Sequence, residues 1–169
     1  MLLFAQEESQ RLCAGTDGLR AAPPDDSAFD WIARAADAGH TGAMALYPHL
    51  AFDAYRDDAA LLADMAEVVR RRERARAHLH TALERGEPAA LGAAAQAYGA
   101  DGVFGPDPAR SLAYFLAYRQ TREGARAPHS LLDTAEHRYA RGLDAVARRN
   151  AEAAAQQILA GWPRPETLR

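Results

Sequence analysis

Alanine occupies 41 of the 169 positions of the chain, whereas valine occupies only four and isoleucine two. Alanine loses no side-chain entropy in a helix, and the β-branched residues that favour strands are almost missing. This composition predicts an all-α fold and excludes a doubly wound sheet, a sandwich or a barrel. Because so many of the apolar side chains are small, the helices must approach one another closely to bury them.

Charge and hydropathy exclude several classes of function. The chain has 23 acidic residues, 20 arginines and no lysine, and its net charge of −3 provides no basic field for nucleic acid or an acidic membrane. No apolar run approaches the roughly 18 residues that a membrane-spanning helix needs, which predicts no membrane insertion. The single cysteine, Cys13, cannot form an internal disulfide.

The composition predicts a bacterial source, and the first residues predict the compartment. Arginine without lysine is typical of a GC-rich bacterial genome. Met1–Ala5 is too short for a signal peptide and lacks a basic flank, which favours a cytoplasmic protein. The alternative is a periplasmic protein in which this apolar stub is the end of a trimmed export signal.

Proline, glycine and capping residues divide the chain into helical segments. The expected helices cover residues 27–38, 41–55, 59–85, 88–98, 108–123 and 130–160. Pro48 should kink or restart the second helix, and Gly142 is a candidate break in the last. We expect a single domain made of an N-terminal segment (1–24), stacked antiparallel helix pairs (25–124) and C-terminal capping helices (125–169).

A spacing pattern of small and aromatic residues recurs along the chain. Residues 28–39 align with residues 75–86 at an offset of 47, and residues 43–45 align with residues 90–92 at the same offset. A partial third copy begins at Ser111. The pattern predicts repeated helix pairs with large side chains buried at the crossings. These side chains are Trp31, Ile32, Leu79, Leu91, Tyr98, Tyr114 and Phe115.

Two stretches, residues 35–43 and residues 86–118, resemble the Sel-one-like repeats of the tetratricopeptide superfamily. The matching residues of the second stretch are Ala90, Leu91, Gly92, Tyr98, Gly102, Val103, Asp107, Tyr114 and Phe115. The chain departs from the family in a residue missing between Tyr98 and Gly102, in Ser111 where alanine is usual, and in the long 47-residue offset. The resemblance covers about residues 26–124. It implies a short α/α solenoid that binds other proteins in bacterial signalling or secretion and has no catalytic residues.

No pattern of residues points to catalysis or to a cofactor. His78 and His80 are two positions apart, so on a helix they diverge and cannot share a metal ion. Asp133 and His137, four apart, could hold zinc or form a simple pair. The glycine-rich stretch 99–105 follows a helix, so it is not a dinucleotide-binding loop. We therefore expect no catalytic residue, no metal site and no cofactor.

The basic run at residues 70–76 has one expected interpretation and two alternatives. Asp64 and Glu67 precede it at helical spacing, which predicts a solvated helix with internal ion pairs. An acidic protein partner is the first alternative and nucleic acid the second, although Glu73 and the negative net charge oppose the latter.

The sequence thus predicts a non-catalytic protein–protein interaction module, either an adaptor or an immunity or inhibitor protein for a secreted bacterial effector. An enzyme on a helical scaffold and a self-associating structural subunit are the open alternatives. The partner should bind the outward face of the small-residue segments 40–55 and 88–99, with arginines of the adjoining helix at the rim. The candidate partner-binding residues are His40, Tyr47, His49, Asp53, Tyr55, Arg71, Arg74 and Gln96.

Overall fold

A computed structural model describes residues 27–55 and 58–163, and this part of the chain is helical without any strand. The helices are α3 (Ser27–Asp37), α4 (Thr41–Leu50), α5 (Asp58–Ala63), α6 (Met65–Glu84), α7 (Pro88–Ala97), α8 (Pro108–Arg119), the short 3-10 helix η1 (Gly124–Arg126), α9 (His129–Tyr139) and α10 (Ala145–Ala160). The predicted all-α fold is confirmed. The N-terminal segment 1–24, with Cys13 and the candidate export-signal stub, lies outside the described residues.

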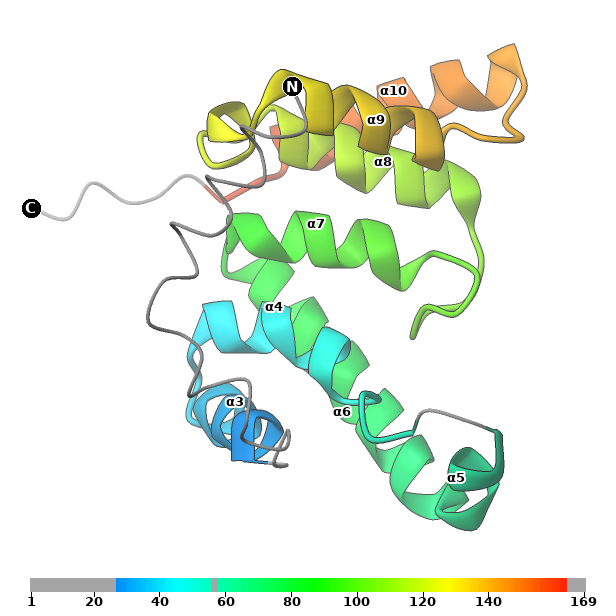
Figure 1. The fold of residues 1–169 in the computed structure, drawn as a ribbon. Coiled ribbons are helices and arrows are strands. Elements are labelled where there is room, and N and C mark those ends of the chain that lie inside the picture. Colours follow the sequence, from blue (N-terminus) through cyan, green and yellow to red (C-terminus); the bar gives the residue numbers. More distant parts are fainter. Residues whose placement is uncertain (1–26, 56–57, 164–169) are drawn as a thin grey trace, which may run out of the picture.

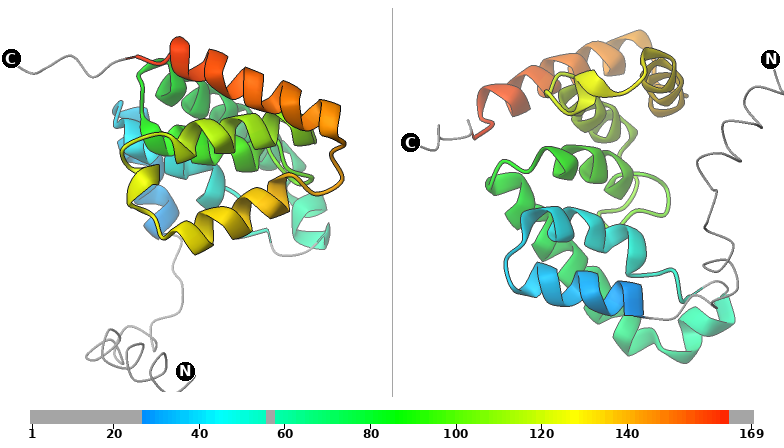
Figure 2. Two further views of the ribbon diagram at one scale, coloured as in Figure 1. Left: turned by 90° about the horizontal axis from the view of Figure 1, so that it is seen from above. Right: turned by 60° about the vertical axis from the view of Figure 1, so that its left-hand side comes forward.

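The helices pack in a stack (Figure 1). Helix α4 contacts α3, α6 and α7, while α7 contacts α8, and α8 contacts α9 and α10. Helices α3 and α10 therefore lie at opposite ends, as the two further views in Figure 2 also show. Helices α4, α7 and α9 run in the same direction, from left to right in Figure 1, so their C-terminal ends lie on one side of the molecule.

Two of the turns between helices have the same local structure. Gly39 follows α3 and Gly86 follows α6, and both have positive φ angles, +94° and +72°, which glycine adopts without strain. In each turn the glycine N–H donates to the carbonyl three residues earlier, and the next N–H donates to the carbonyl five residues earlier. The residue after each glycine then caps the following helix through its side chain. The turns lie 47 residues apart, as do the bounds of α4 and α7.

The same two turns also contact each other. The hydroxyl of Thr41 donates to the Glu87 carboxylate at 2.7 Å, and the Arg85 guanidinium donates to the Gly39 carbonyl at 3.0 Å. Gly124, the glycine that follows the partial third copy of the pattern, differs because it begins a 3-10 helix and is buried. A Cβ atom there would lie 2.2 Å from the carbonyl oxygen of Tyr118, so the close approach of the backbone requires glycine.

Several predicted helix bounds are wrong. Helix α4 ends at Leu50, because the chain turns at residues 51–54 and the Ala51 carbonyl accepts a hydrogen bond from Arg71. The predicted helix 59–85 is two helices, since Asp64 leaves the helical region at φ −130° and ψ 42°. Helix α8 stops at Arg119, four residues early. The candidate break at Gly142 is confirmed, since the segment 130–160 forms two helices and Gly142 between them has a φ of +80°.

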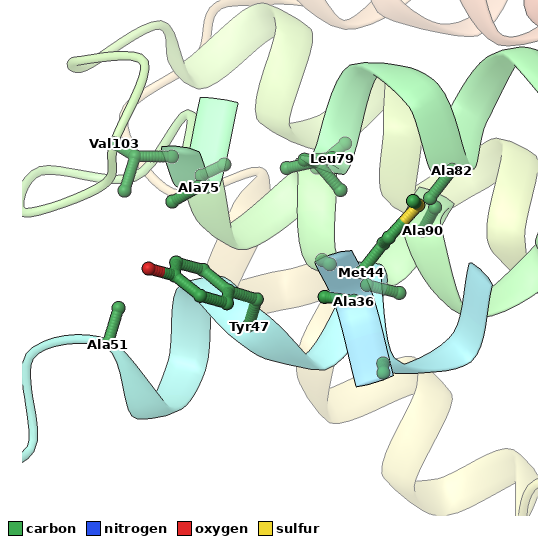
Figure 3. Close-up of a cluster of buried hydrophobic side chains, with 14 of the residues drawn as sticks. Ala36, Met44, Tyr47, Ala51, Ala75, Leu79, Ala82, Ala90 and Val103 are labelled. Atoms are coloured by element: carbon green, nitrogen blue, oxygen red, sulfur yellow. The ribbon is translucent and has the colours of Figure 1, made fainter. Parts of the chain in front are cut away.

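The largest cluster of buried side chains joins α3, α4, α6 and α7 (Figure 3). Tyr47 and Leu79 are fully buried in it among alanines such as Ala75, Ala82 and Ala90, so small residues do bring the helices close together.

Most of the side chains expected at helix crossings are inside the molecule. Leu79, Leu91 and Phe115 are buried, and Ile32, Tyr98 and Tyr114 are partly buried. The prediction for Trp31 is wrong, because this side chain is 66% exposed. It lies on the first helix of the stack, where no other described helix covers its outer face. The Arg34 guanidinium lies 4.4 Å from its ring centroid instead.

Candidate functional site

A groove of about 520 Å³ lies at the C-terminal ends of α4, α7 and α9. Pro48, His49 and Phe52 line it from the end of α4 and the turn that follows. Ala93, Gln96 and Ala97 line it from α7, residues 99–103 from the next loop, and Arg138 and Tyr139 from the end of α9. Its volume is in the range of sites that bind small ligands or side chains of a partner.

The walls of the groove combine apolar, aromatic and polar side chains. The Tyr139 ring packs on Phe115 with a centroid distance of 4.9 Å, which fixes one wall. The Arg138 guanidinium lies 5.2 Å from the centroid of the same ring. Gln96 is exposed, and its side-chain amide makes no hydrogen bond within the described part of the chain. The amide is therefore available to a ligand.

The groove has an uneven distribution of charge. Three helices end at it, and the C-terminal end of a helix carries a partial negative charge. Asp101 adds an exposed carboxylate and Arg138 an exposed guanidinium. Partial burial lowers the pKa of His49 below its ordinary value near 6.5, against the opposing influence of the Asp53 carboxylate. This shift favours the neutral form of the His49 ring.

Among the predicted partner-binding residues, His49 and Gln96 lie in the groove. They are 47 positions apart, so they occupy the same place in α4 and α7. The predicted outward position of Tyr47 is wrong, because this side chain is 0% exposed. Residue 47 lies on the face of α4 that packs against Phe29 and His78, with ring centroids 5.4 Å and 4.9 Å away.

Three other candidates lie outside the lining of the groove. His40 is exposed at the opposite end of α4, where its Nδ1 accepts a hydrogen bond from the Ala43 N–H at 3.2 Å. Asp53 is exposed beyond the end of α4. Tyr55 is half-buried, and its hydroxyl donates to the Asp64 carboxylate at 3.1 Å. Capping and local hydrogen bonds account for His40 and Tyr55.

The arginines expected at the rim instead connect α6 to its neighbours. Arg71 donates to Glu67 at 2.8 Å and to the Ala51 carbonyl at 2.9 Å. Arg74 donates to Asp37 of α3 at 2.5 Å. Ion pairs of Glu67 with Arg70 and Arg71 were expected from the spacing and are present. The basic run is thus largely engaged in contacts within the chain.

The third wall of the groove was not among the residues predicted from the sequence. Arg138 and Tyr139 lie at the end of α9, in a segment that was expected only to cap the stack. No local pattern marks these two residues, because the contacts of Arg119 of α8 with Asp133 and Glu136 bring α9 to the groove. Phe52 and Asp101 were missed because each follows a helix, in a stretch expected to be helical or only connecting.

The described residues offer little for metal chemistry. They contain no group of three histidine, cysteine, aspartate or glutamate side chains that could hold a metal ion. The Asp133 carboxylate pairs with Arg119 at 2.8 Å, and the His137 Nδ1 lies 2.7 Å from the backbone carbonyl of Asp133. None of the described helices has the length and apolar character to cross a bilayer.

Comparison of the chain with protein-family models, curated proteins and solved structures gives no match. Its function is therefore inferred from the groove and the residues around it.

A second polar cluster joins α3, α4 and α6. His78 is largely buried, and its Nε2 lies 3.3 Å from the Asp37 carboxylate, out of line for a hydrogen bond. Burial lowers the pKa of His78, and nearby Asp37 opposes this shift while Arg74 adds to it. The hydrogen bond from Arg74 is the main cause that lowers the pKa of Asp37. The fold therefore favours neutral His78 beside an ionised Asp37.

Acidification from about pH 7.5 to about pH 5.5 is expected to destabilise the protein through His78. In the unfolded chain the histidine pKa is about 6.5, above its value in the folded chain. Above the unfolded pKa, the stabilisation by neutral His78 is complete. It is lost as the pH falls below that value and through the pKa of His78 in the folded chain. The pKa of His49 is also lowered, so His49 should likewise make the protein less stable as the pH falls. Melting temperatures measured over this range should fall less for His78→Gln than for the natural chain, and equal slopes would contradict the prediction.

Proposed function

We propose that this protein is a non-catalytic protein-interaction module whose groove at the ends of α4, α7 and α9 receives a segment of another protein. One observation carries the proposal: side chains at equivalent positions of two helices, His49 and Gln96, line one groove together with Arg138 and Tyr139 of a third. Aromatic and arginine side chains around small apolar residues are typical of protein interfaces.

The resemblance to Sel-one-like repeats belongs to the same proposal. The two matching glycine turns, the parallel α4 and α7, and the successive packing of helices are what a short repeat stack would have. Within it, the protein acts as an adaptor, or as an immunity or inhibitor protein for a secreted effector, in the bacterial cytoplasm. The engagement of Arg71 and Arg74 in contacts within the chain favours the groove over the basic run as the binding surface.

Occlusion of the groove tests this function. Ala100 lies in the lining and is exposed, so Ala100→Trp should fill the groove without disturbing the core. Ala125, exposed in η1 and outside the lining, provides the matched control Ala125→Trp. A partner captured from the native host with the natural chain is purified and titrated against all three proteins. We expect a loss of affinity of about tenfold or more for Ala100→Trp only, as for the loss of one interface hot spot. Equal affinities for the two variants would place the binding surface elsewhere.

A further inference from the structure

A group of exposed apolar side chains lies where α5 meets α6. Leu62 is 69% exposed, Met65 56% and Val69 50%. Met65 and Val69 are four positions apart, so they share one face of α6. The other large apolar side chains that are exposed in the described part of the chain lie singly on four different helices. Apolar side chains that gather in one place mark an interaction surface, whereas scattered ones need no explanation.

This α5–α6 surface, made of Leu62, Met65 and Val69, lies apart from the rest of the stack. Among the described helices, the only extensive packing of α5 is on α6. Figure 1 shows α5 and the first turns of α6 at the lower right, beyond the other helices. None of the three side chains lines the groove, so a second binding surface is present on the molecule.

Charged side chains of opposite sign lie at the two ends of the α5–α6 surface. Asp64 precedes Met65 at the start of α6, and Arg72 follows Val69 by three positions; both are exposed. The Asp64 carboxylate accepts a hydrogen bond from the Tyr55 hydroxyl at 3.1 Å. Neither Asp64 nor Arg72 makes an ion pair with a residue that the structure describes. A surface with an acidic end, an apolar middle and a basic end is complementary to an antiparallel copy of itself.

We propose that two copies of this chain associate through the α5–α6 surface, with their α6 helices antiparallel about a two-fold axis near residue 68. In a two-fold interface each contact occurs twice. Asp64 and Arg72 are each four positions from that axis, about 6 Å along the helix, so Arg72 of one copy lies beside Asp64 of the other. Met65 then lies within a turn of Val69 of the second copy. The same orientation separates the two basic runs at residues 70–76, which a parallel pair would bring together. This association does not depend on the proposed function of the groove.

Sedimentation equilibrium tests the association. The natural chain is measured from about 5 µM to about 500 µM, because an interface of this small size belongs to the weak class. We expect the average mass to rise with concentration from the 18.3 kDa of one chain towards twice that value. Val69→Glu should raise the dissociation constant of the dimer at least about tenfold, since it buries a carboxylate of each copy in the apolar middle. The matched control Val146→Glu, at a valine that is 56% exposed on α10, should leave the constant unchanged. A chain that stays monomeric over the whole range, or equal effects of the two variants, would overturn the proposal.

A charge reversal tests the antiparallel orientation. Arg72→Glu turns the attraction to Asp64 of the second copy into a repulsion, and the symmetric dimer contains this pair twice. We expect the dissociation constant to rise by about fivefold or more at about 50 mM salt, where exposed charges are weakly screened. Arg149→Glu, at an exposed arginine of α10, makes the same change in net charge and should alter the constant by less than about twofold. Circular dichroism verifies that each variant is folded. Equal effects of the two reversals would contradict the contact between Arg72 and Asp64.

Discussion

Replacement of Tyr47 with alanine is expected to lower the free energy of unfolding by about 3–5 kcal/mol, the range for large aromatic side chains removed from a core. The Tyr47 side chain is 0% exposed, and its ring lies between Phe29 of α3 and His78 of α6. Truncation would leave a cavity where α3, α4 and α6 meet. Chemical denaturation followed by far-ultraviolet circular dichroism measures the effect.

The matched control is Tyr47→Phe, which keeps the ring and removes the hydroxyl. That hydroxyl is buried and has no hydrogen-bond partner among the residues that the structure describes. Because an unsatisfied buried polar atom stabilises nothing, its removal should be neutral or stabilise the fold by up to about 1 kcal/mol. A Tyr47→Ala variant within about 1 kcal/mol of the natural chain, or a Tyr47→Phe variant as unstable as Tyr47→Ala, would show that the packing described for this ring is wrong.

The features that could be predicted from the sequence are those set by local chemistry. Alanine in place of β-branched residues fixes the fold class, and glycines 39 and 86 end helices because each adopts a positive φ. The residue after each glycine caps the next helix, so α4 and α7 begin where the pattern predicts them. His49 and Gln96 follow from this register, which is why these two candidates lie in the groove.

The features that could not be predicted depend on contacts between distant residues. Helix α4 stops where Arg71, twenty positions later, binds the Ala51 carbonyl. Which side of α4 is buried depends on where α3 and α6 lie, so Tyr47 is in the core although the sequence placed it beside His49 on the surface. Helix α9 lies at the groove because it packs against α8, where the Arg119 guanidinium pairs with Asp133 and Glu136 of α9. The third wall of the groove therefore has no local signal.

Replacement of Phe115 with alanine is the second substitution with a large expected effect, a loss of about 3–5 kcal/mol in the free energy of unfolding. Phe115 is 5% exposed on α8 and packs with Ala95 of α7, with Leu132 and with the Tyr139 ring. Because Tyr139 lines the groove, this side chain also supports the candidate binding surface from beneath. Denaturation of the purified variant measures the loss.

Trp31→Ala is the control for Phe115→Ala, because the repeat pattern predicts that both aromatic side chains are buried at helix crossings. Trp31 is 66% exposed, and its described contact with Arg34 is worth about 0.5–1 kcal/mol at an exposed site. Its truncation should therefore cost about 1 kcal/mol or less. The losses in unfolding free energy of the two variants distinguish the burial that the repeat register predicts from the burial that the structure shows. The register alone places both residues in the core and predicts similar losses, whereas the structure predicts a difference of at least about 2 kcal/mol, because only Phe115 would leave a cavity. Equal losses would contradict the exposed position of Trp31 on α3.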